Sequence, residues 1–287
     1  MSRGVNPVTT GRSSAYGRGM QSTGKDLARQ IVVISTAVFM LIASLVGSGV
    51  LGGTPVQELQ DGALAADGSL LAPASPAFSI WSVIYVLLIG YAIWQALPGQ
   101  RARERQRALG WWIALSMVFN GLWLVLAQFA TLPLTVAGIV ALLIVLCITF
   151  QRTVVYPAEG LFDSLLIDGS TGLHLGWVSL ATVANTSAWL TAEGPSSWES
   201  FGTTAGVLVL IVVGLIGLAL TWRSGWRIAP ALALGWGLSW LAVGRLQLEP
   251  HDTAIGVTAA IVAVVIPLVA ILGTVSSRLV GARNAGA

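Results

Sequence analysis

Charged residues are scarce in this chain of 287 residues. Asp, Glu, Lys and Arg together make up 9% of it, whereas a soluble domain carries about 25%. Hydrophobic residues make up 55%, and the mean hydropathy is +0.80. This composition excludes an ordinary soluble globular domain and indicates an integral membrane protein.

Cysteine is almost absent, and so are the common catalytic signatures. The single cysteine, Cys147, excludes an internal disulfide and a multi-cysteine metal site. No Gly-x-Ser-x-Gly or His-Glu-x-x-His motif occurs, and no pair of carboxylates lies in the middle of an apolar stretch. Nothing resembles a nucleic-acid-binding patch or motif. We therefore expect no metal, no nucleic-acid partner and no required cofactor, and an enzyme is a minor alternative.

Long apolar runs are abundant, and they predict the fold. A transmembrane helix needs about 20 mainly apolar residues. Eight stretches qualify, which predicts an all-α integral membrane protein with about eight transmembrane helices: 31–52, 77–97, 109–130, 132–151, 166–190, 203–222, 227–244 and 254–275.

Polar segments flank these runs. Residues 1–30 are rich in Gly, Ser and Arg and are predicted to form a disordered tail. Residues 191–202 are predicted to be an outer loop, and 277–287 a second tail.

The basic residues predict the orientation of the chain. Cytoplasmic loops of membrane proteins are enriched in Lys and Arg. With eight spans and a cytoplasmic N-terminus, only Arg245 of the 15 Lys and Arg residues falls outside. One helix more or fewer would scramble this partition. We therefore expect both termini in the cytoplasm and the chain in the cell (inner) membrane.

One outer loop is long. Residues 53–76 join the first two predicted spans, with three carboxylates and no basic residue. A loop of more than about 15 residues without regular structure is often a lid or binding segment. The loop is therefore interpreted either as a lid or as a solvated connector.

Aromatic and amide side chains are predicted to converge beneath this loop. At about 1.5 Å of rise per residue, they lie at mid-depth or in the outer half of the second, third and fifth spans. Trp81, Trp123 and Trp177 lie too deep for an interfacial belt, whereas Trp189 fits either a belt or a pocket. Mostly apolar pockets with a few placed polar groups are typical ligand sites. The alternative is that the amides bond across helix interfaces. The predicted ligand-binding residues are Phe78, Trp81, Tyr85, Asn120, Trp123, Trp177, Asn185 and Trp189.

Two glycine patterns predict close helix packing. His174 lies within "GLHLG", where Gly172 and Gly176 would allow a neighbouring helix to approach. This favours a buried interhelical hydrogen bond for His174 over a metal or haem ligand. "GVLGG" (49–53) offers a second Gly-x3-Gly face, which would allow a homodimer.

Three motifs resemble the TspO/MBR family, the tryptophan-rich sensory proteins related to the peripheral benzodiazepine receptor. They are "PAFSIWSVIY" with "YAIW", "FNGLW" and "LGWVSLATVANTSAW" (175–189). The resemblance covers 31–190 and implies a five-helix bundle, followed by three added helices in 203–276. It also implies an apolar, partly aromatic ligand, such as a tetrapyrrole (a porphyrin or haem-type molecule) or a sterol, in a pocket closed by the first loop.

Three classes of function remain after this resemblance. A membrane sensor or carrier that binds a hydrophobic small molecule accounts best for the Trp and Asn residues. The alternative is a secondary transporter of a small hydrophobic solute, for which Asp168 in "LIDGSTG" is the carboxylate to examine, against a capping or surface role. An enzyme that degrades a tetrapyrrole is the third.

Overall fold

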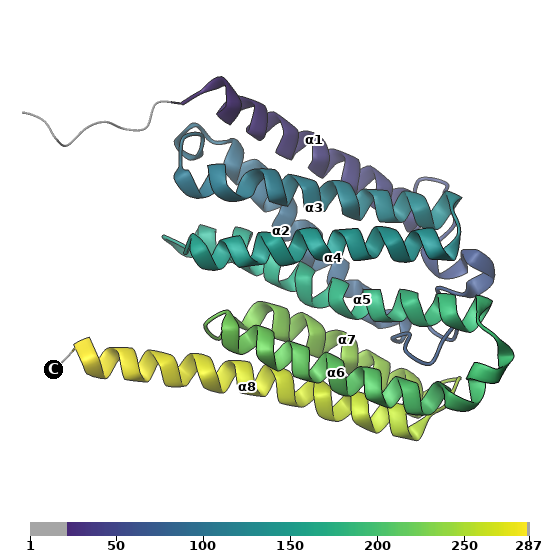
Figure 1. The fold of residues 1–287 in the computed structure, drawn as a ribbon. Helices are drawn as coiled ribbons and strands as arrows, with labels where there is room; N and C mark the ends of the chain where they lie inside the picture. Colours follow the sequence, from purple (N-terminus) through teal and green to yellow (C-terminus); the bar gives the residue numbers. More distant parts are fainter. Residues whose placement is uncertain (1–21, 286–287) are drawn as a thin grey trace, which may run out of the picture.

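The structure is a computed structural model that describes residues 22–285. Eight long α-helices lie side by side along a common direction (Figure 1). No strand occurs in the described part of the chain, so the prediction of an all-helical protein is confirmed. The helices are Gly24–Gly47 (α1), Ile80–Ala96 (α2), Glu104–Phe129 (α3), Leu132–Val155 (α4), Ser170–Glu193 (α5), Gly202–Arg223 (α6), Ile228–Gln247 (α7) and Thr253–Ala285 (α8).

Short helical segments precede three of these helices. Ser75–Ser79 is a 3-10 turn before α2, and Ser196–Phe201 is another before α6. Asp163–Gly169 is a π-helical segment that leads directly into α5. Each α-helix contains most of one apolar stretch predicted above.

Six of the eight helices, all except α5 and α7, are long and apolar enough to cross a membrane. The two exceptions are interior helices: α5 packs against α2, α4 and α7, and α7 packs against α5, α6 and α8. Small and polar residues are tolerated there because protein, rather than lipid, surrounds them. The chain is therefore an all-helical integral membrane protein.

Helix α1 begins seven residues before the predicted span. The predicted tail 1–30 is therefore wrong for 24–30, and its residues 1–21 lie outside the described part. Hydropathy does not predict residues 24–30 as part of the helix, because their polar side chains are stabilised by hydrogen bonds to residues far away in the sequence. The Arg29 guanidinium donates to the Arg101 carbonyl (2.9 Å), and the Gln30 amide donates to the Gln95 carbonyl (2.7 Å).

The same helix ends before the second glycine motif. Gly47 is its last residue, and Gly49 and Gly52 have φ angles of +81° and +85°, a backbone conformation that favours glycine. Gly49 and Gly53 therefore lie in a turn. The predicted Gly-x3-Gly helix face at 49–53 is wrong and gives no support to a homodimer.

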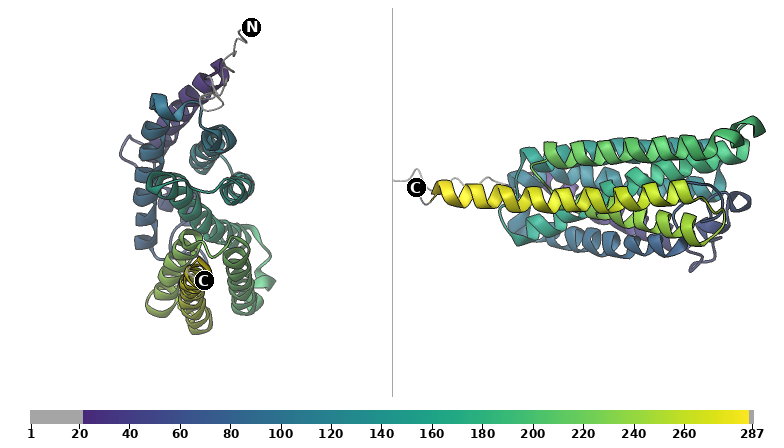
Figure 2. Two further views of the ribbon diagram at one scale, coloured as in Figure 1. Left: turned by 90° about the vertical axis from the view of Figure 1, so that its left-hand side faces the viewer. Right: turned by 90° about the horizontal axis from the view of Figure 1, so that it is seen from below.

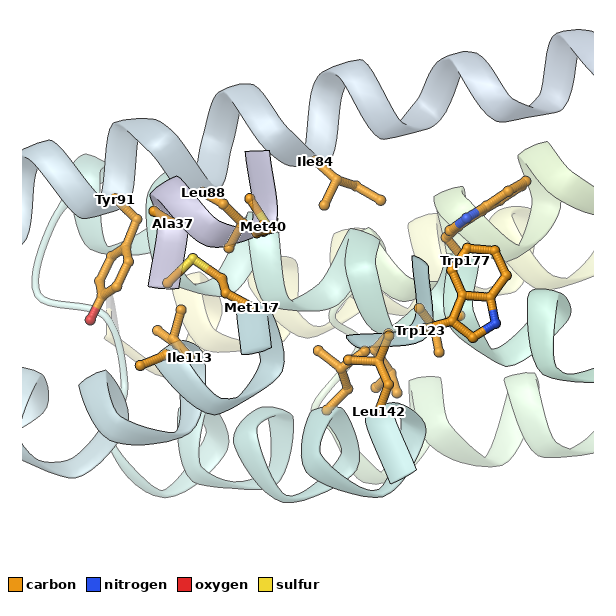
Figure 3. Close-up of a cluster of buried hydrophobic side chains, with 14 of the residues drawn as sticks. Ala37, Met40, Ile84, Leu88, Tyr91, Ile113, Met117, Trp123, Leu142 and Trp177 are labelled. Carbon is orange, nitrogen blue, oxygen red and sulfur yellow. The ribbon is translucent and has the colours of Figure 1, made fainter. Parts of the chain in front are cut away.

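Two large apolar clusters form most of the interior, and a small third one lies beneath the loop between α1 and α2. The first brings together side chains of α1–α5, including Met40, Leu88, Met117 and Leu142 (Figure 3). The second joins α6, α7 and α8 to Leu180 of α5. The two clusters therefore meet where α5 packs on α7 (Figure 2).

Glycines make this α5–α7 contact close, as predicted. A Cβ on Gly176 would lie 2.2 Å from the Pro230 carbonyl oxygen, and one on Gly172 would lie 2.7 Å from the Ala229 Cβ. Side chains at these positions would push the helices apart.

Buried ion pairs join the helices at the end of the molecule that carries the 97–103 connection, which we call the arginine-rich end. Asp26 of α1 pairs with Arg107 of α3 at 2.6 Å. Asp163 pairs with Arg103 at 2.7 Å, and Asp168 pairs with Arg105 and, at 3.1 Å, with Arg227. The carboxylate of Asp163 is 2% exposed, and burial of such charges is tolerated only when they are paired.

Candidate ligand-binding site

A small cavity of about 40 Å³ lies beneath the loop between α1 and α2, toward the end opposite the arginine-rich end. It is lined by five of the eight predicted residues: Phe78, Trp81, Trp123, Trp177 and Asn185. They come from the 3-10 turn before α2, from α2 itself, from α3 and from α5. Figure 3 shows Trp123 and Trp177 beside each other at one end of the first apolar cluster.

The aromatic rings of the site contact one another edge to face. The Trp177 ring lies 5.6 Å from the Phe78 ring and 6.1 Å from the Trp81 ring, with interplanar angles of 77° and 81°. Trp81 also stacks on Tyr85 at 5.2 Å. Both arrangements are favourable for aromatic pairs, and they hold the indoles in fixed orientations.

Three polar groups belong to this site: the indole N–H groups of Trp123 and Trp177 and the side-chain amide of Asn185. The Trp123 indole N–H donates to the Asn185 Oδ1 (3.2 Å), and the Asn185 Nδ2 donates to the Ala181 carbonyl (2.9 Å). The Trp177 indole N–H is buried and has no hydrogen-bond partner among residues 22–285. A buried donor without a partner is costly, so an acceptor on a bound molecule would be stabilised here.

The other three predicted residues do not line the cavity. The Tyr85 hydroxyl donates to the Asn120 Oδ1 (3.2 Å) and joins α2 to α3. The Nδ2 of Asn120 is buried without a partner. Trp189 packs against the buried cluster of Leu64, Ala127, Leu132 and Ala188, and its indole N–H donates to Glu193 (2.9 Å). Tyr85 and Asn120 therefore support the cavity from deeper in the bundle, and Trp189 lies at its rim.

The long loop covers the cavity, in agreement with the lid interpretation. Loop residues 63–65, 72 and 73 form part of the lining. The Gln60 side chain donates to the Ala130 carbonyl at the end of α3 (2.6 Å), and Gln128 of α3 donates to the Thr54 carbonyl. The loop is therefore tied to the bundle at its first half.

Helix α7 holds the second half of the loop. Arg245 is completely buried and donates to the carbonyls of Ser69 (3.2 Å) and Ala66 (2.9 Å). The Ala74 N–H donates to the Trp240 carbonyl (3.2 Å), and the Trp236 indole N–H donates to the carbonyl of Ala77 (2.9 Å). The sequence predicts that Arg245 lies at the extracytoplasmic end of its helix and indicates no role for it. Its isolation, as the one basic residue predicted outside, was the available signal.

Small residues of α5 provide the space in the cavity. Ala181, Ala184 and Ala188 line it, at the i, i+3 and i+7 positions of one helix face. Sequence reasoning missed them because it searched for polar and aromatic side chains. Their shared face with Asn185 was visible in the sequence.

His174 lies next to the cavity without lining it. Its ring contacts the Trp81 ring edge to face at 5.6 Å, and its Nε2 is buried without a hydrogen-bond partner. The predicted interhelical hydrogen bond is therefore not made by Nε2. Within residues 22–285, no group of three or more His, Cys, Asp or Glu residues could hold a metal ion.

Eight long helices, most of them apolar along their length, and a tryptophan-lined cavity beneath a loop define an all-helical membrane protein of TspO type. The family model described as "TSPO-like protein" matches residues 29–272, and the chain belongs to this family. The resemblance predicted from the three motifs is thus confirmed. The match continues past the predicted limit of 190 and includes α6, α7 and most of α8. No curated protein and no solved structure matches the chain.

Proposed function

We propose that this protein is a membrane sensor or carrier that binds an apolar, partly aromatic small molecule in the cavity beneath loop 53–76. The observation that supports the proposal is the convergence of Trp81, Trp123 and Trp177, from three helices, on one loop-covered cavity. Indole rings stack on flat apolar ligands, and the unpaired Trp177 N–H offers one oriented donor.

The cavity volume indicates that the ligand enters by displacing the loop. A volume of about 40 Å³ accommodates a few water molecules, whereas sites for drug-sized ligands measure about 300–1,000 Å³. The loop is held by hydrogen bonds to α3 and α7 and by the buried side chains of Leu64 and Leu71, so its opening would break these contacts and leave most helix–helix contacts in place.

The family resemblance implies a tetrapyrrole- or sterol-like ligand, and the lining limits how a tetrapyrrole would be held. The described lining residues include no His, Cys, Met or Tyr that could coordinate a haem iron. A porphyrin-type ligand would therefore be bound by stacking on indoles and by a hydrogen bond, and its ring would replace the loop residues that now fill the site.

We also propose that all eight helices cross the cell (inner) membrane, with both termini in the cytoplasm. The positive-inside rule supports this orientation, because only one of the 15 basic residues would then lie outside. The cavity would open toward the extracytoplasmic side. A ligand would reach it from there or from the outer leaflet.

The structure gives the transporter alternative less support. Asp168, the carboxylate that could couple ion movement to transport, is paired with Arg105 and Arg227 at the arginine-rich end. A carboxylate held between two guanidinium groups stabilises the helix contact. Proton-coupled transport that is lost in Asp168→Asn would restore this alternative.

Tryptophan fluorescence tests the proposed function. Titration of the detergent-purified protein with protoporphyrin IX should quench the fluorescence in a saturable manner. Trp177→Leu and Asn185→Leu should raise the Kd, Trp177→Leu by about two- to tenfold through its lost stacking contact. Trp111→Leu, at a half-exposed indole near the arginine-rich end, is the control and should leave the Kd unchanged.

Two results would overturn the proposal. One is the absence of saturable quenching by protoporphyrin IX and by a panel of other apolar aromatic molecules. The other is an equal Kd in Trp177→Leu, Asn185→Leu and Trp111→Leu, with all three variants eluting as monodisperse protein. Mass spectrometry of molecules that co-purify with the native protein would identify the ligand class directly.

A further inference from the structure

A groove runs along the outside of the molecule between α4 and α6, and α5 and α7 form its floor. Its half nearer the arginine-rich end has a volume of about 640 Å³, within the range of small-molecule sites. Helix α6 packs mainly on α8 and α7 and makes little contact with α4. The groove lies on a different face of α5 from the tryptophan-lined cavity.

The lining of this groove is suited to a hydrocarbon chain. Most of its residues are apolar, among them Leu143, Phe150, Val213 and Leu220. The hydroxyls of Ser179 and Thr182, which also line it, donate to carbonyls one turn earlier in α5, each at 2.8 Å. The floor therefore presents no free hydroxyl hydrogen, and a polar occupant would gain little there.

One end of the groove carries a free cationic group. Arg223 is exposed at the end of α6, lines the groove and makes no hydrogen bond or ion pair within residues 22–285. Gln151 of α4 lies on the same lining. An anionic group at this position would be stabilised by charge and by a bidentate hydrogen bond.

The opposite half of the molecule has a second hollow, which differs in charge. This outer hollow measures about 570 Å³ and shares Thr182 and Val183 with the groove. Its lining includes Asp67 and Glu199 and no basic residue. Of these two hollows, only the groove, which is lined by Arg223, therefore has a charge that attracts an anion.

We propose that the groove between α4 and α6 binds a phospholipid with an anionic headgroup, with its acyl chain against α5 and its phosphate at Arg223. The arginine-rich end faces the cytoplasm under the positive-inside rule. Basic pockets between transmembrane helices on that side bind anionic headgroups. A free phosphate has no acyl chain and would gain nothing from the apolar lining of the groove.

Photocrosslinking tests this site. The full-length protein is placed in nanodiscs of phosphatidylcholine that contain a small fraction of phosphatidylglycerol with a diazirine in its acyl chain. Crosslinks should concentrate on residues 143–155 and 213–224. Arg223→Gln should reduce them about fivefold. Arg278→Gln, at an exposed arginine of α8 outside the lining, is the matched control and should leave them unchanged.

A second pair of variants tests the groove itself. Ile216 lines the groove and Leu215 does not, and both are 62% exposed. Ile216→Trp should occupy the space and reduce crosslinking of both diazirine-phosphatidylglycerol and diazirine-phosphatidylcholine, and Leu215→Trp should not. Excess inorganic phosphate should not compete, because it lacks the acyl chain.

Three outcomes would overturn the proposal. The first is uniform crosslinking along all lipid-facing helices. The second is an equal yield in Arg223→Gln and Arg278→Gln. The third is an equal crosslinking yield in Ile216→Trp and Leu215→Trp. All four substitutions are at exposed positions, and monodisperse elution of each variant shows that it is folded.

Discussion

The two ends of this molecule differ in the kind of polar group that they bury, although single atoms without a hydrogen-bond partner, such as Arg29 Nε and Gln95 Oε1, also occur at the arginine-rich end of the described chain. At the arginine-rich end, carboxylates such as Asp26 and Asp163 are paired with guanidinium groups of neighbouring helices. At the tryptophan-lined end, the indole of Trp177 and the amide of Asn120 keep buried N–H groups without partners, next to small alanines and a cavity. Charge pairs between helices therefore predominate at one end, and unpaired N–H groups beside a cavity at the other.

This comparison indicates which end of the fold contributes most to stability and which end is the candidate for function. Buried ion pairs fix the register of helices because a shift leaves charges without partners. Unpaired donors and spare volume cost stability, and proteins retain them at sites that bind other molecules. Substitutions at the first end should therefore change unfolding, and substitutions at the second should change loop opening and binding.

The largest effect is expected at Arg103, which has one buried and one exposed carboxylate partner. Asp163 is 2% exposed and Glu159 is 73% exposed. Asp163→Asn should lower the free energy of unfolding by about 3–5 kcal/mol, because Asp163 also lies 3.5 Å from the buried guanidinium of Arg105, which would lose one of its counter-charges. Denaturant unfolding in micelles, followed by circular dichroism, measures this change.

Glu159→Gln is the matched control at the same arginine. An exposed ion pair contributes about 0–1 kcal/mol, so this variant should unfold almost as the native protein does. Equal destabilisation by Asp163→Asn and Glu159→Gln would remove the distinction between the two partners, and with it the first half of the comparison.

A smaller and local effect is expected at Arg245, the buried arginine of the tryptophan-lined end. Its partners are carbonyls of the loop, so Arg245→Met should release the loop and leave the bundle intact. Hydrogen bonds to charged groups contribute about 1.5–3 kcal/mol, which corresponds to about ten- to hundredfold faster amide exchange in residues 66–74. Hydrogen–deuterium exchange with mass spectrometry measures this, and Arg278→Met is the control. Unchanged exchange in the loop would show that Arg245 does not hold it.

The smallest effect is expected for Tyr85→Phe, which removes the hydrogen bond to Asn120 between α2 and α3. Interhelical hydrogen bonds in membrane proteins average about 0.6 kcal/mol. Tyr156→Phe is the control, since the Tyr156 hydroxyl makes no hydrogen bond in the described part of the chain. A loss above about 2 kcal/mol in micelle unfolding for Tyr85→Phe would mean that the tryptophan-lined end also depends on its polar contacts for folding.

Much of the fold could be predicted because apolar runs and short loops dominate the sequence. Eight runs predicted eight helices, and the glycines at 172 and 176 predicted a close helix neighbour. The start of α1 could not be predicted from hydropathy, because Arg29 and Gln30 are stabilised by carbonyls more than 60 residues away. The glycines of 49–53 misled for a related reason, since a Gly-x3-Gly spacing does not indicate where a helix ends.

The site was predictable only in part. Helical spacing and depth predicted a convergence of aromatic and amide side chains. Five of the predicted residues line one cavity: Phe78, Trp81, Trp123, Trp177 and Asn185. Neither spacing nor depth gives side-chain partners. Trp189 bonds to Glu193 one turn later, which only the rotamers of the folded helix reveal. The role of Arg245 depends on the path of an irregular loop, for which no periodicity exists.

Helix α5 has a consequence that reaches beyond either site. Ala181 and Asn185 line the tryptophan-lined cavity, and their neighbours Thr182 and Val183 line the groove beside α6. Helix α5 therefore separates the cavity from the groove. A shift of α5 that enlarged one of them would reduce the volume of the other. By thermodynamic reciprocity, each occupant would alter the other's affinity by the same factor. The surrounding bilayer would then act as an effector of ligand binding.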